Sequence, residues 1–272
     1  MSKPVQRIAL VVNHSKPAAQ AVGTAFQHLA EALGLSVITS SDYPIAPELL
    51  KGADACCIVG GDGTLLGVVA AATTYNVPVV GINLGKLGFM ATYLPEDTET
   101  LLHDLQNGNY SLSNRSILTC RDAHGVRQLA LNDVVIRTHT LRLCTLHVDC
   151  GQEHLNDFRG DGLIFATPTG STAYNLSTGG PIVHPTARVL LVTPICPHTL
   201  SNRTVIIDEH TPLSVRLDEF TTGLCVSVDG REWAVHSGNF PLEIALAKEQ
   251  FQLIQPVNFS HFHLVRTKLQ WS

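Results

Sequence analysis

The sequence predicts an α/β domain in residues 1–108, followed by a mostly β, sandwich-like domain in residues 109–250. Up to about residue 108, short apolar runs alternate with stretches of helical periodicity, which is typical of parallel strands joined by helices. Beyond that point, short β-rich runs separated by turns replace the helices. The length of 272 residues is enough for two such domains, each with its own core.

The α/β domain is predicted to begin with a strand and a long helix. Ile8 to Val12 is a compact apolar run, as in a buried parallel strand. From Pro17 to Leu33 apolar residues recur at steps of three and four, and Gly34 ends this predicted helix. Two further strands are predicted at Val37 to Thr39 and at Ala55 to Val59.

The rest of this domain continues the alternation. A helix of small residues is predicted from about Leu65 to Thr74, then a strand from Val77 to Ile82. Pro95 to Asn107 is predicted to form another helix, which Gly108 closes. The strands predicted in the second domain are Leu129–Arg137, Leu143–Asp149, Leu163–Ala166, Thr204–Ile207, Leu213–Leu217 and Leu224–Val228.

Composition and charge exclude several classes of protein. Hydrophobic residues make up 44% of the chain and charged residues 15%, which argues against disorder. The formal net charge of −5 argues against a nucleic-acid partner, which would call for a basic face. No apolar stretch approaches the length of a membrane span, and the apolar run near the N-terminus is too short for a signal peptide. A cytoplasmic location is therefore expected.

The seven cysteines give no sign of a metal site. They include no C-x-x-C pair, which is the usual zinc signature. The two closest histidines, His261 and His263, have no carboxylate or cysteine beside them. Buried, reduced thiols in a cytosolic protein are the expected state of the cysteines.

The first motif is Gly60-Gly61-Asp62-Gly63-Thr64, between a predicted strand and a predicted helix. Open α/β sheets bind ligands at the carboxyl ends of their strands. Three glycines let the backbone approach a ligand, and a following helix N-terminus suits phosphate. A carboxylate at Asp62 suits a site that also deprotonates a hydroxyl or holds Mg²⁺. The alternative is a tight turn in which Asp62 caps a helix.

The second and third motifs are also polar interruptions beside predicted strands. Gly81-Ile82-Asn83-Leu84-Gly85-Lys86-Leu87-Gly88-Phe89-Met90 follows the next strand and could wall a nucleotide pocket, or place Phe89 in the core. Asn132-Asp133 interrupts the apolar run Leu129 to Ile136. On a buried strand such residues need partners, so a ligand such as a ribose diol or a polar network is predicted. A strand edge facing water is the alternative.

The fourth motif is the longest. It contains Phe158-Arg159-Gly160-Asp161-Gly162, then Thr167-Pro168-Thr169-Gly170-Ser171-Thr172-Ala173-Tyr174-Asn175-Leu176-Ser177, then Gly179-Gly180-Pro181. Few cores absorb so many hydroxyls and turn residues without a ligand. A merely structural loop of this length and composition is uncommon. The segment is therefore predicted to hydrogen-bond a polar and aromatic ligand.

These motifs, in this order, resemble those of bacterial NAD kinases over residues 8 to about 260. The Gly-Gly-Asp-Gly-Thr motif alone is shared with lipid kinases and phosphofructokinases, whereas the block from Thr167 to Asn175 is specific. The resemblance implies that the tail, residues 251–272, returns to the α/β domain, and that the active site lies between the domains. It also implies NAD and ATP as substrates, a divalent ion (Mg²⁺ or Mn²⁺), and a homodimer or homotetramer.

The resemblance also implies roles for individual residues. Asp62 would act on the ribose 2′-hydroxyl as base or orienter, and Gly63 with the neighbouring amides would hold phosphate. Phe89 would help form the adenine wall, Asn132 and Asp133 would grip the ribose, and Asp161 would face the nicotinamide. The residues implied to contact nucleotide are Gly61, Gly63, Thr64, Phe89, Asn132, Asp133, Arg159, Asp161, Thr169, Thr172, Ala173, Tyr174 and Ser177.

Two positions depart from the family pattern. Asp133 stands where the family usually has Glu, so the charge is kept but the reach is one methylene shorter, and ribose contacts there would be longer or bridged by water. Met90 stands where an aromatic residue is frequent. The donor range, including polyphosphate, and the preference between NAD and NADH are not indicated by the sequence.

Two other functions compete with this reading. A lipid kinase would share the glycine-aspartate loop, but it gives no reason for the block from Thr167 to Asn175 and calls for a membrane-facing surface. A regulator that binds NAD without turning it over would not need Asp62. Formation of NADP from NAD and ATP separates the three.

Overall fold

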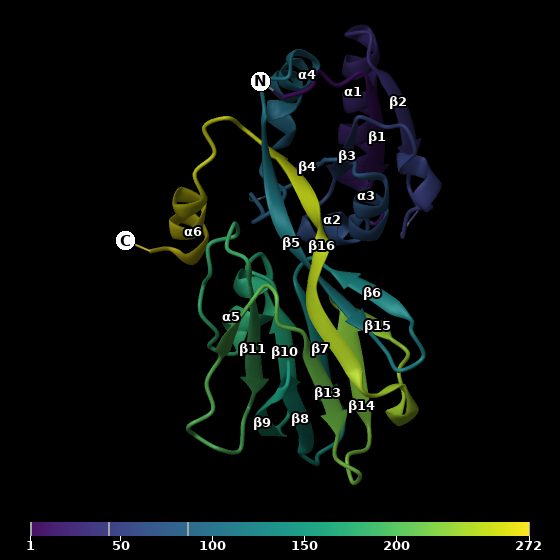
Figure 1. Ribbon diagram of the computed structural model, residues 1–272. Coiled ribbons are helices and arrows are strands. Elements are labelled where there is room, and N and C mark those ends of the chain that lie inside the picture. Colours follow the sequence, from purple (N-terminus) through teal and green to yellow (C-terminus); the bar gives the residue numbers. More distant parts are fainter. Residues whose placement is uncertain (1, 43, 86, 272) are drawn as a thin grey trace. The chain divides into compact units, whose positions relative to one another are not determined.

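The computed structural model describes residues 2–42, 44–85 and 87–271, and the chain divides into two compact units. One unit comprises residues up to Asn114 together with those from Phe251 onward, and the other comprises Arg115–Gln250. Figure 1 shows the elements of both units. The segment after Phe251 thus belongs to the unit that contains the first 114 residues.

The first unit contains a parallel sheet with strand order β2-β1-β3-β4-β16. Its strands are β1 (Arg7–Val12), β2 (Ser36–Ser40), β3 (Ala55–Val59), β4 (Val79–Ile82) and the end of β16 (Leu242–Gln255). β16 joins by pairing Leu253 with Val79 of β4. The carboxyl ends of β1 to β4 therefore lie at one edge of the sheet, where the glycine-rich loops begin.

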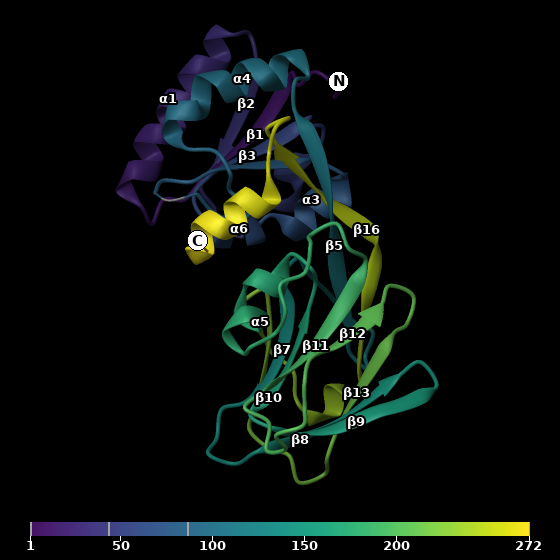
Figure 2. The same cartoon turned by 90° about the vertical axis from the view of Figure 1, so that its left-hand side faces the viewer.

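Helices cover this sheet and complete its core. α1 (Pro17–Ala32) contacts β1, β2 and β3 and packs beside α4 (Thr98–Asn107), as Figure 2 shows. Phe26 of α1 and Leu101 of α4 are fully buried in one cluster with Leu10 of β1. Two shorter helices follow β3, namely α2 (Asp62–Leu66) and α3 (Val69–Tyr75), while α6 (His261–Leu269) follows β16.

Two helices differ from their predicted form. The helix predicted from Leu65 to Thr74 is two helices, α2 and α3, and the first begins at Asp62. At the junction the amides of Gly67 and Val68 donate to carbonyls three residues back, those of Thr64 and Leu65, both at 3.1 Å, and this tighter pattern interrupts the α-helix. The helix predicted from Pro95 begins with a 3₁₀ turn, Pro95–Asp97, before α4.

The second unit is a sandwich of two sheets around one core. The fully antiparallel sheet has the order β12-β11-β10-β7-β14-β15, and the other sheet holds β8, β9, β13, the start of β16, and β5 with β6. Val134 and Phe165 of one sheet and Leu146 and Val215 of the other belong to one buried cluster. The strands are β5 (Ser111–Arg121), β6 (Arg127–Ala130), β7 (Asp133–Thr138), β8 (Cys144–Cys150), β9 (Glu153–Gly160), β10 (Gly162–Ala166), β11 (Val189–Ile195), β12 (Val205–Asp208), β13 (Leu213–Leu217), β14 (Leu224–Val228) and β15 (Arg231–Trp233).

The strand predicted from Leu129 to Arg137 is two strands. β6 ends at Ala130 and β7 begins at Asp133, so Asn132 lies in the break between them. The apolar run gave the appearance of one strand because both sides of the break are buried. The sequence patterns do not predict β5, β9, β11, β15 or β16.

Candidate functional site

The loop after β3 is fixed by contacts among its own residues and to β1. The Gly60 amide donates to the Ile82 carbonyl at 2.9 Å, and Asn13 Nδ2 donates to Thr64 Oγ1 at 2.9 Å. A Cβ at Gly60 would lie 2.8 Å from the Thr64 Cβ, so this position requires glycine. Thr64 is buried, whereas Gly61 is half-buried and Gly63 is exposed. The loop therefore presents Gly61 and Gly63 at its surface.

The carboxylate of Asp62 joins this loop to the second glycine-rich loop. Its Oδ2 accepts the Phe89 amide at 2.9 Å, and its Oδ1 accepts the amides of Met90 at 3.1 Å and Ala91 at 2.9 Å. A Cβ at Gly88 would overlap this carboxylate, which explains the glycine there. The helix-cap alternative for Asp62 is wrong, because Asp62 is the first residue of α2 and the cap position, Gly61, has no side chain.

Phe89 lies beside a cation from the C-terminal helix of the same unit. The Lys268 Nζ of α6 is 5.9 Å from the centre of the Phe89 ring, within the range of a cation–π contact. Phe89 is half-buried, so it is not a core residue, whereas Met90 is buried. α6 thus covers part of the loop that Asp62 holds.

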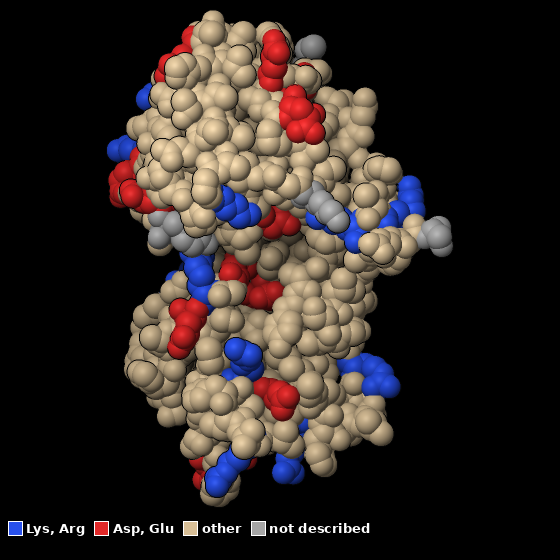
Figure 3. Space-filling view, turned by 180° about the vertical axis from the view of Figure 1, so that it is seen from behind, with Lys and Arg blue, Asp and Glu red and all other residues tan. Residues whose placement is uncertain are grey.

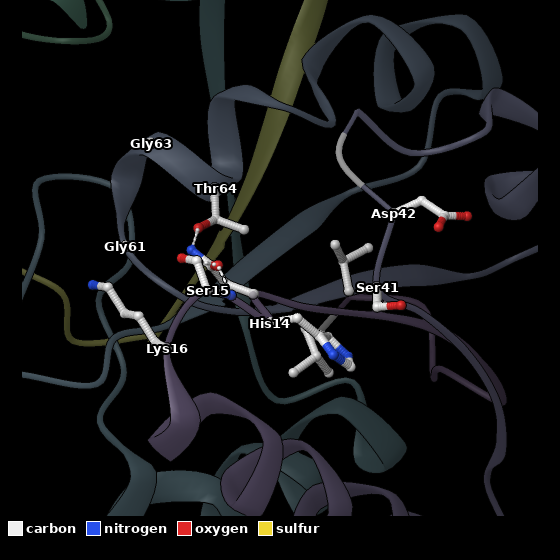
Figure 4. Close-up of a pocket in the computed structure, with 11 residues that line it drawn as sticks. His14, Ser15, Lys16, Ser41, Asp42, Gly61, Gly63 and Thr64 are labelled. Atoms are coloured by element: carbon white, nitrogen blue, oxygen red, sulfur yellow. Dashed lines mark hydrogen bonds between the residues drawn. The ribbon is translucent and has the colours of Figure 1, made fainter.

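A cavity of about 490 Å³ opens beside the first loop. Its lining comes from the end of β1, from the loop before α1, from the residues after β2, and from the start of α2 (Figure 4). Valine side chains form its apolar wall, and hydroxyl, imidazole, ammonium and carboxylate groups surround them. The lining residues are Val11, Val12, Asn13, His14, Ser15, Lys16, Ser41, Asp42, Gly61, Gly63 and Thr64.

In the second unit, the break before β7 meets the loop after β10. The Thr167 amide donates to the Asn132 carbonyl at 2.9 Å, and Thr167 Oγ1 donates to the Leu131 carbonyl at 2.5 Å. A Cβ at Gly170 would overlap the Asn132 carbonyl. Ala166 at the end of β10 pairs with Asp133 at the start of β7. The third and fourth motifs are therefore neighbours.

Asp229 holds this break from a third segment. It lies in the Asp229-Gly230 turn between β14 and β15 and is 7% exposed. Its Oδ2 accepts the Leu131 amide at 2.8 Å, and its Oδ1 accepts the amides of Asn132 at 2.7 Å and Asp133 at 3.1 Å. Asp229 is not among the residues predicted from the sequence. The Asp-Gly pair between alternating apolar residues was the available signal, because it is typical of a two-residue hairpin.

Asp133 is a buried acid beside another acid. It is 5% exposed, which rules out the alternative of a strand edge facing water. Burial, together with the charge of Asp229, raises the pKa of Asp133 to about 7. Burial also raises the pKa of Asp229, while the three amides and the Arg231 cation oppose that rise. Burying the two carboxyl groups of Asp133 and Asp229 therefore costs solvation free energy.

Much of the polar block after β10 is satisfied within the protein. Asn175 is fully buried, and its Nδ2 donates to the carbonyls of Ser171 and Pro181, both at 3.1 Å. Thr193 Oγ1 donates to Asn175 Oδ1 at 2.6 Å, and Ser171 Oγ donates to the Pro168 carbonyl at 2.6 Å. The expectation that so many polar groups require a ligand is therefore wrong for these residues, because local turns satisfy them.

Other residues of the same block remain available to a ligand. Thr169 Oγ1 is buried and has no hydrogen-bond partner within the described part of the chain. Tyr174 is 38% exposed at the start of α5 (Tyr174–Ser177), and Ser177 at its end is exposed. Thr172 and Ala173 are half-buried beside them. Thr172 ends the 3₁₀ turn Gly170–Thr172, Thr169 precedes the turn, and the other three residues follow it.

Asp161 lies at the far end of β10 from Asp133, and Arg159 lies on the preceding strand, β9. Asp161 precedes the first residue of β10, whereas Asp133 pairs with the last, so about 15 Å of strand separates them. The Asp161 carbonyl accepts the Thr138 amide at 2.9 Å, and its carboxylate hydrogen-bonds the Cys196 thiol, raising the pKa of that thiol. Arg159 is exposed on β9.

Charged side chains of both signs are spread over one face of the described residues, and potential metal ligands among these residues do not cluster. On the face drawn in Figure 3, Lys and Arg side chains alternate with Asp and Glu side chains. The part of the chain that the structure describes contains no group of three or more His, Cys, Asp or Glu side chains that could hold a metal ion. Among the same residues, no helix is long and apolar enough to cross a membrane.

Two family models match the chain. Residues 18–110 match the ATP-NAD kinase N-terminal domain, and residues 131–255 match the ATP-NAD kinase C-terminal domain. Among curated proteins, the NAD kinase of Nitrosomonas europaea is 38% identical over 249 residues, covering 89% of this chain and 84% of that protein. The NAD kinase of Nitrosomonas eutropha is 34% identical over 284 residues, covering 97% and 95%.

Solved structures share the fold. The yeast NADH kinase complexed with NADH has a TM-score of 0.87 at 23% identity, covering 99% of this chain and 88% of that one. An NAD kinase from Archaeoglobus fulgidus in complex with ATP has a TM-score of 0.80 at 21% identity, covering 97% and 98%. The predicted fold class, an α/β part followed by a mostly β part, is confirmed.

Proposed function

The chain belongs to the ATP-NAD kinase family and is a phosphotransferase that converts NAD to NADP, and we propose that Asp62 orients the attacking hydroxyl. The resemblance found in the sequence is thereby confirmed. NADP differs from NAD by a phosphate on the 2′-oxygen of the adenosine ribose. The nucleophile is therefore that 2′-hydroxyl, and the donor is ATP.

The observation that carries the role of Asp62 is its set of three amide donors. A carboxylate has about four positions that accept hydrogen bonds. Two on Oδ1 and one on Oδ2 are taken by the amides of residues 89–91, so among the described residues one position on Oδ2 remains. A carboxylate fixed in this way can hold a hydroxyl in line for attack and accept its proton late in the transfer. Orientation is thus its first contribution.

The acceptor is bound by residues of the second unit in this proposal. Asp133 and Asn132 accept hydrogen bonds from ribose hydroxyls, because both lie at the break that Thr167 and Asp229 fix. Thr169 offers a buried hydroxyl that lacks a protein partner among the described residues. Tyr174 offers an exposed ring for stacking. Thr172, Ala173 and Ser177 complete the proposed contacts.

The donor phosphates are proposed to lie in the cavity beside Gly61, Gly63 and Thr64 (Figure 4). Lys16 lines the same cavity and supplies a positive charge for the phosphates. Because the described residues present no cluster of metal ligands, we propose that the divalent ion enters as part of the substrate MgATP. Mg²⁺ is commonly held by phosphate oxygens together with one or two carboxylates.

We further propose a homodimer or homotetramer in which a second copy brings Arg159 and Asp161 to the nicotinamide end of NAD. What supports this arrangement is the resemblance to NAD kinases, which implies a homodimer or homotetramer, together with the exposed position of Arg159 on β9. A cytoplasmic location is proposed from the seven cysteines, all of which are free thiols.

The test of the reaction identifies the product and the position of its phosphate. The purified protein is incubated with ATP, Mg²⁺ and NAD, and the product is offered to a dehydrogenase that accepts NADP but not NAD. Reduction of the product by that enzyme is the expected result. Absence of product, or a product phosphorylated elsewhere on the dinucleotide, would contradict the proposal.

A further inference from the structure

The hairpin between β14 and β15 reaches the start of β7 with a buried carboxylate. Asp229 has a φ of 49° and Gly230 a φ of 73°, the left-handed pair that a tight two-residue turn requires. This geometry aims the Asp229 carboxylate at three consecutive amides, those of residues 131–133. The Asp229 amide in turn donates to the Asp133 carbonyl at 2.9 Å. Four hydrogen bonds thus fix one short segment.

The two acids of this arrangement are not equivalent. Three amide donors and the nearby Arg231 favour the charged form of the Asp229 carboxylate. Within the described residues, the Asp133 carboxylate receives no hydrogen bond from a side chain or an amide. When only one of the two carboxyl groups is ionised, the negative charge therefore lies on Asp229. Asp133 must ionise against that charge in a buried position.

We propose that Asp229 is a positioning residue for the NAD acceptor: it fixes Asn132 and Asp133, and its negative charge sets the protonation state in which Asp133 meets the ribose. The proposal rests on the proposed function, in which Asp133 binds that ribose. Asp229 does not touch the substrate in this account. It acts through the backbone of residues 131–133 and through its charge.

Apart from Asp229 and Arg231, the groups named here around Asp133 are neutral. β10 presents Ala166 opposite it, and the loop after β10 contributes the hydroxyls of Thr167 and Thr169. The hairpin contributes Asp229 and, on β15, Arg231. Asp229 is the charged group that perturbs Asp133, in addition to burial. The pH dependence of acceptor binding should therefore respond to Asp229 specifically.

The expected behaviour of the wild-type enzyme follows from these charges. Burial and Asp229 raise the pKa of Asp133 to about 7, so its charged form is a minor one at pH 6 and the major one at pH 8. A carboxylate is a stronger acceptor for ribose hydroxyls than a neutral acid. The KM for NAD should fall by up to about tenfold as pH rises across this range.

The test compares KM for NAD against pH in the wild type and three variants. Asp229→Asn removes the charge with little change of shape, so the fall in KM should move to lower pH by at least one unit. Asp229→Glu keeps the charge but misplaces it, so KM should rise at every pH with the midpoint unchanged. Asp208→Asn, at an exposed aspartate that bonds Thr211, is the control and should match the wild type.

The outcomes separate positioning from mere support of the fold. A purely structural Asp229 predicts lower stability and higher KM in both Asp229 variants, with the midpoint of the pH dependence unmoved in Asp229→Asn. That unmoved midpoint would overturn the proposal.

A second measurement covers the case in which Asp229→Asn does not fold. The aspartate carboxyl signals of the wild type are titrated by carbon-13 NMR, and the buried pair should show one step near pH 7, well above ordinary aspartates. Titration of every aspartate below about pH 5.5 would overturn the proposal. Loss of the ribose role is recognised separately, because Asp133→Ala would then bind NAD like the wild type whatever the titration shows.

Discussion

At the scale of single residues, two aspartates far apart in the sequence use the same arrangement. Asp62 accepts the consecutive amides of residues 89–91, and Asp229 accepts those of residues 131–133. Backbone amides donate without side-chain freedom, so each carboxylate is held with little loss of conformational entropy. Asp62 is half-buried, whereas Asp229 is enclosed. Asp62 can therefore contact a substrate, whereas Asp229 can contact only other groups of the protein.

Asp62→Asn should lower kcat by about 10²–10⁴, the range for a lost general base, while NAD binds within a few-fold of the wild type. Gly88→Ala should also lower kcat, because its Cβ would displace the Asp62 carboxylate without changing its charge. Gly85→Ala is the matched control, since a Cβ there meets nothing within 4 Å. Single-turnover rates and NAD affinity on folded protein measure this. Near-normal turnover by Asp62→Asn would leave Asp62 only the role of joining the two loops.

Asp133→Ala should raise the KM for NAD by the equivalent of about 1.5–3 kcal/mol, because it removes a charged acceptor for the ribose. Asp133→Glu should be tolerated, since it restores the residue that the family usually has. Steady-state kinetics at saturating ATP provide the measurement. Unchanged NAD kinetics in Asp133→Ala would mean that the ribose is bound elsewhere.

Asp133 should also make the fold sensitive to pH. In the unfolded chain an aspartate loses its proton near pH 4, but burial and Asp229 raise the folded pKa of Asp133 to about 7. Between these values the native state binds the extra proton, so its contribution to stability falls as pH rises. The Asp133→Asn variant has no ionisable group at this position, so its stability does not fall with rising pH for this reason. Its stability relative to the wild type should therefore increase between pH 5 and pH 8, by about 2.5 kcal/mol.

Urea unfolding of both proteins at the two pH values measures the difference. An equal difference at pH 5 and pH 8 would show that Asp133 ionises normally in the folded protein. The comparison must use the free protein, because bound NAD would itself change the stability.

At the scale of elements, the polar block after β10 combines support and recognition in adjacent residues. Asn175 ties Ser171, Pro181 and Thr193 together and is fully buried. Tyr174, one position earlier, has no such task and is exposed. The block can therefore be dense in polar groups because some of them build the turn that displays the others.

Asn175→Ala should destabilise the protein by about 2–4 kcal/mol, because it leaves buried carbonyls and a buried hydroxyl unpaired. Tyr174→Ala should change the melting temperature little and raise the KM for NAD several-fold. Thermal unfolding and kinetics on the two variants separate the roles. Equal loss of stability in both variants would contradict the assignment of a structural role to Asn175 and a binding role to Tyr174.

The sequence predicted the positions of the polar loops better than the strands around them. Glycine-rich loops at strand ends and the Asn132-Asp133 pair are visible because polar residues interrupt apolar runs. The bonding of Asp62 to residues 89–91 was not predictable, since no local pattern links positions 27 residues apart. β16 was missed because exposed and buried residues do not alternate regularly along it. Its partners, β4 and β13, are fixed by tertiary contacts rather than by local preference.

At the scale of the whole molecule, two long strands run through both compact units. β5 crosses from the first unit to the second at Asn114, and β16 crosses back at Gln250. β16 pairs with β13 near its start and with β4 near its end. Each unit therefore depends on residues supplied by a strand that it shares with the other.

The protein should be a homo-oligomer at micromolar concentration, in which a second copy brings Arg159 and Asp161 to the nicotinamide end of the NAD bound at Asp133. Asp161→Asn should then alter the KM for NAD although it is remote from Asp133 in its own chain. Light scattering during turnover gives the mass. A single species of 29.3 kDa in the active enzyme would contradict the assembly.

The pairing of Leu253 with Val79 has a consequence for biosynthesis. β4 leaves the ribosome long before its neighbour exists, because the intervening chain takes roughly 10–35 s to translate at usual rates. During that interval one edge of an apolar parallel sheet is unpaired, and such edges attract other chains. The nascent protein therefore passes through a stage in which protection by chaperones matters most, and that stage ends only when residues 251–255 emerge.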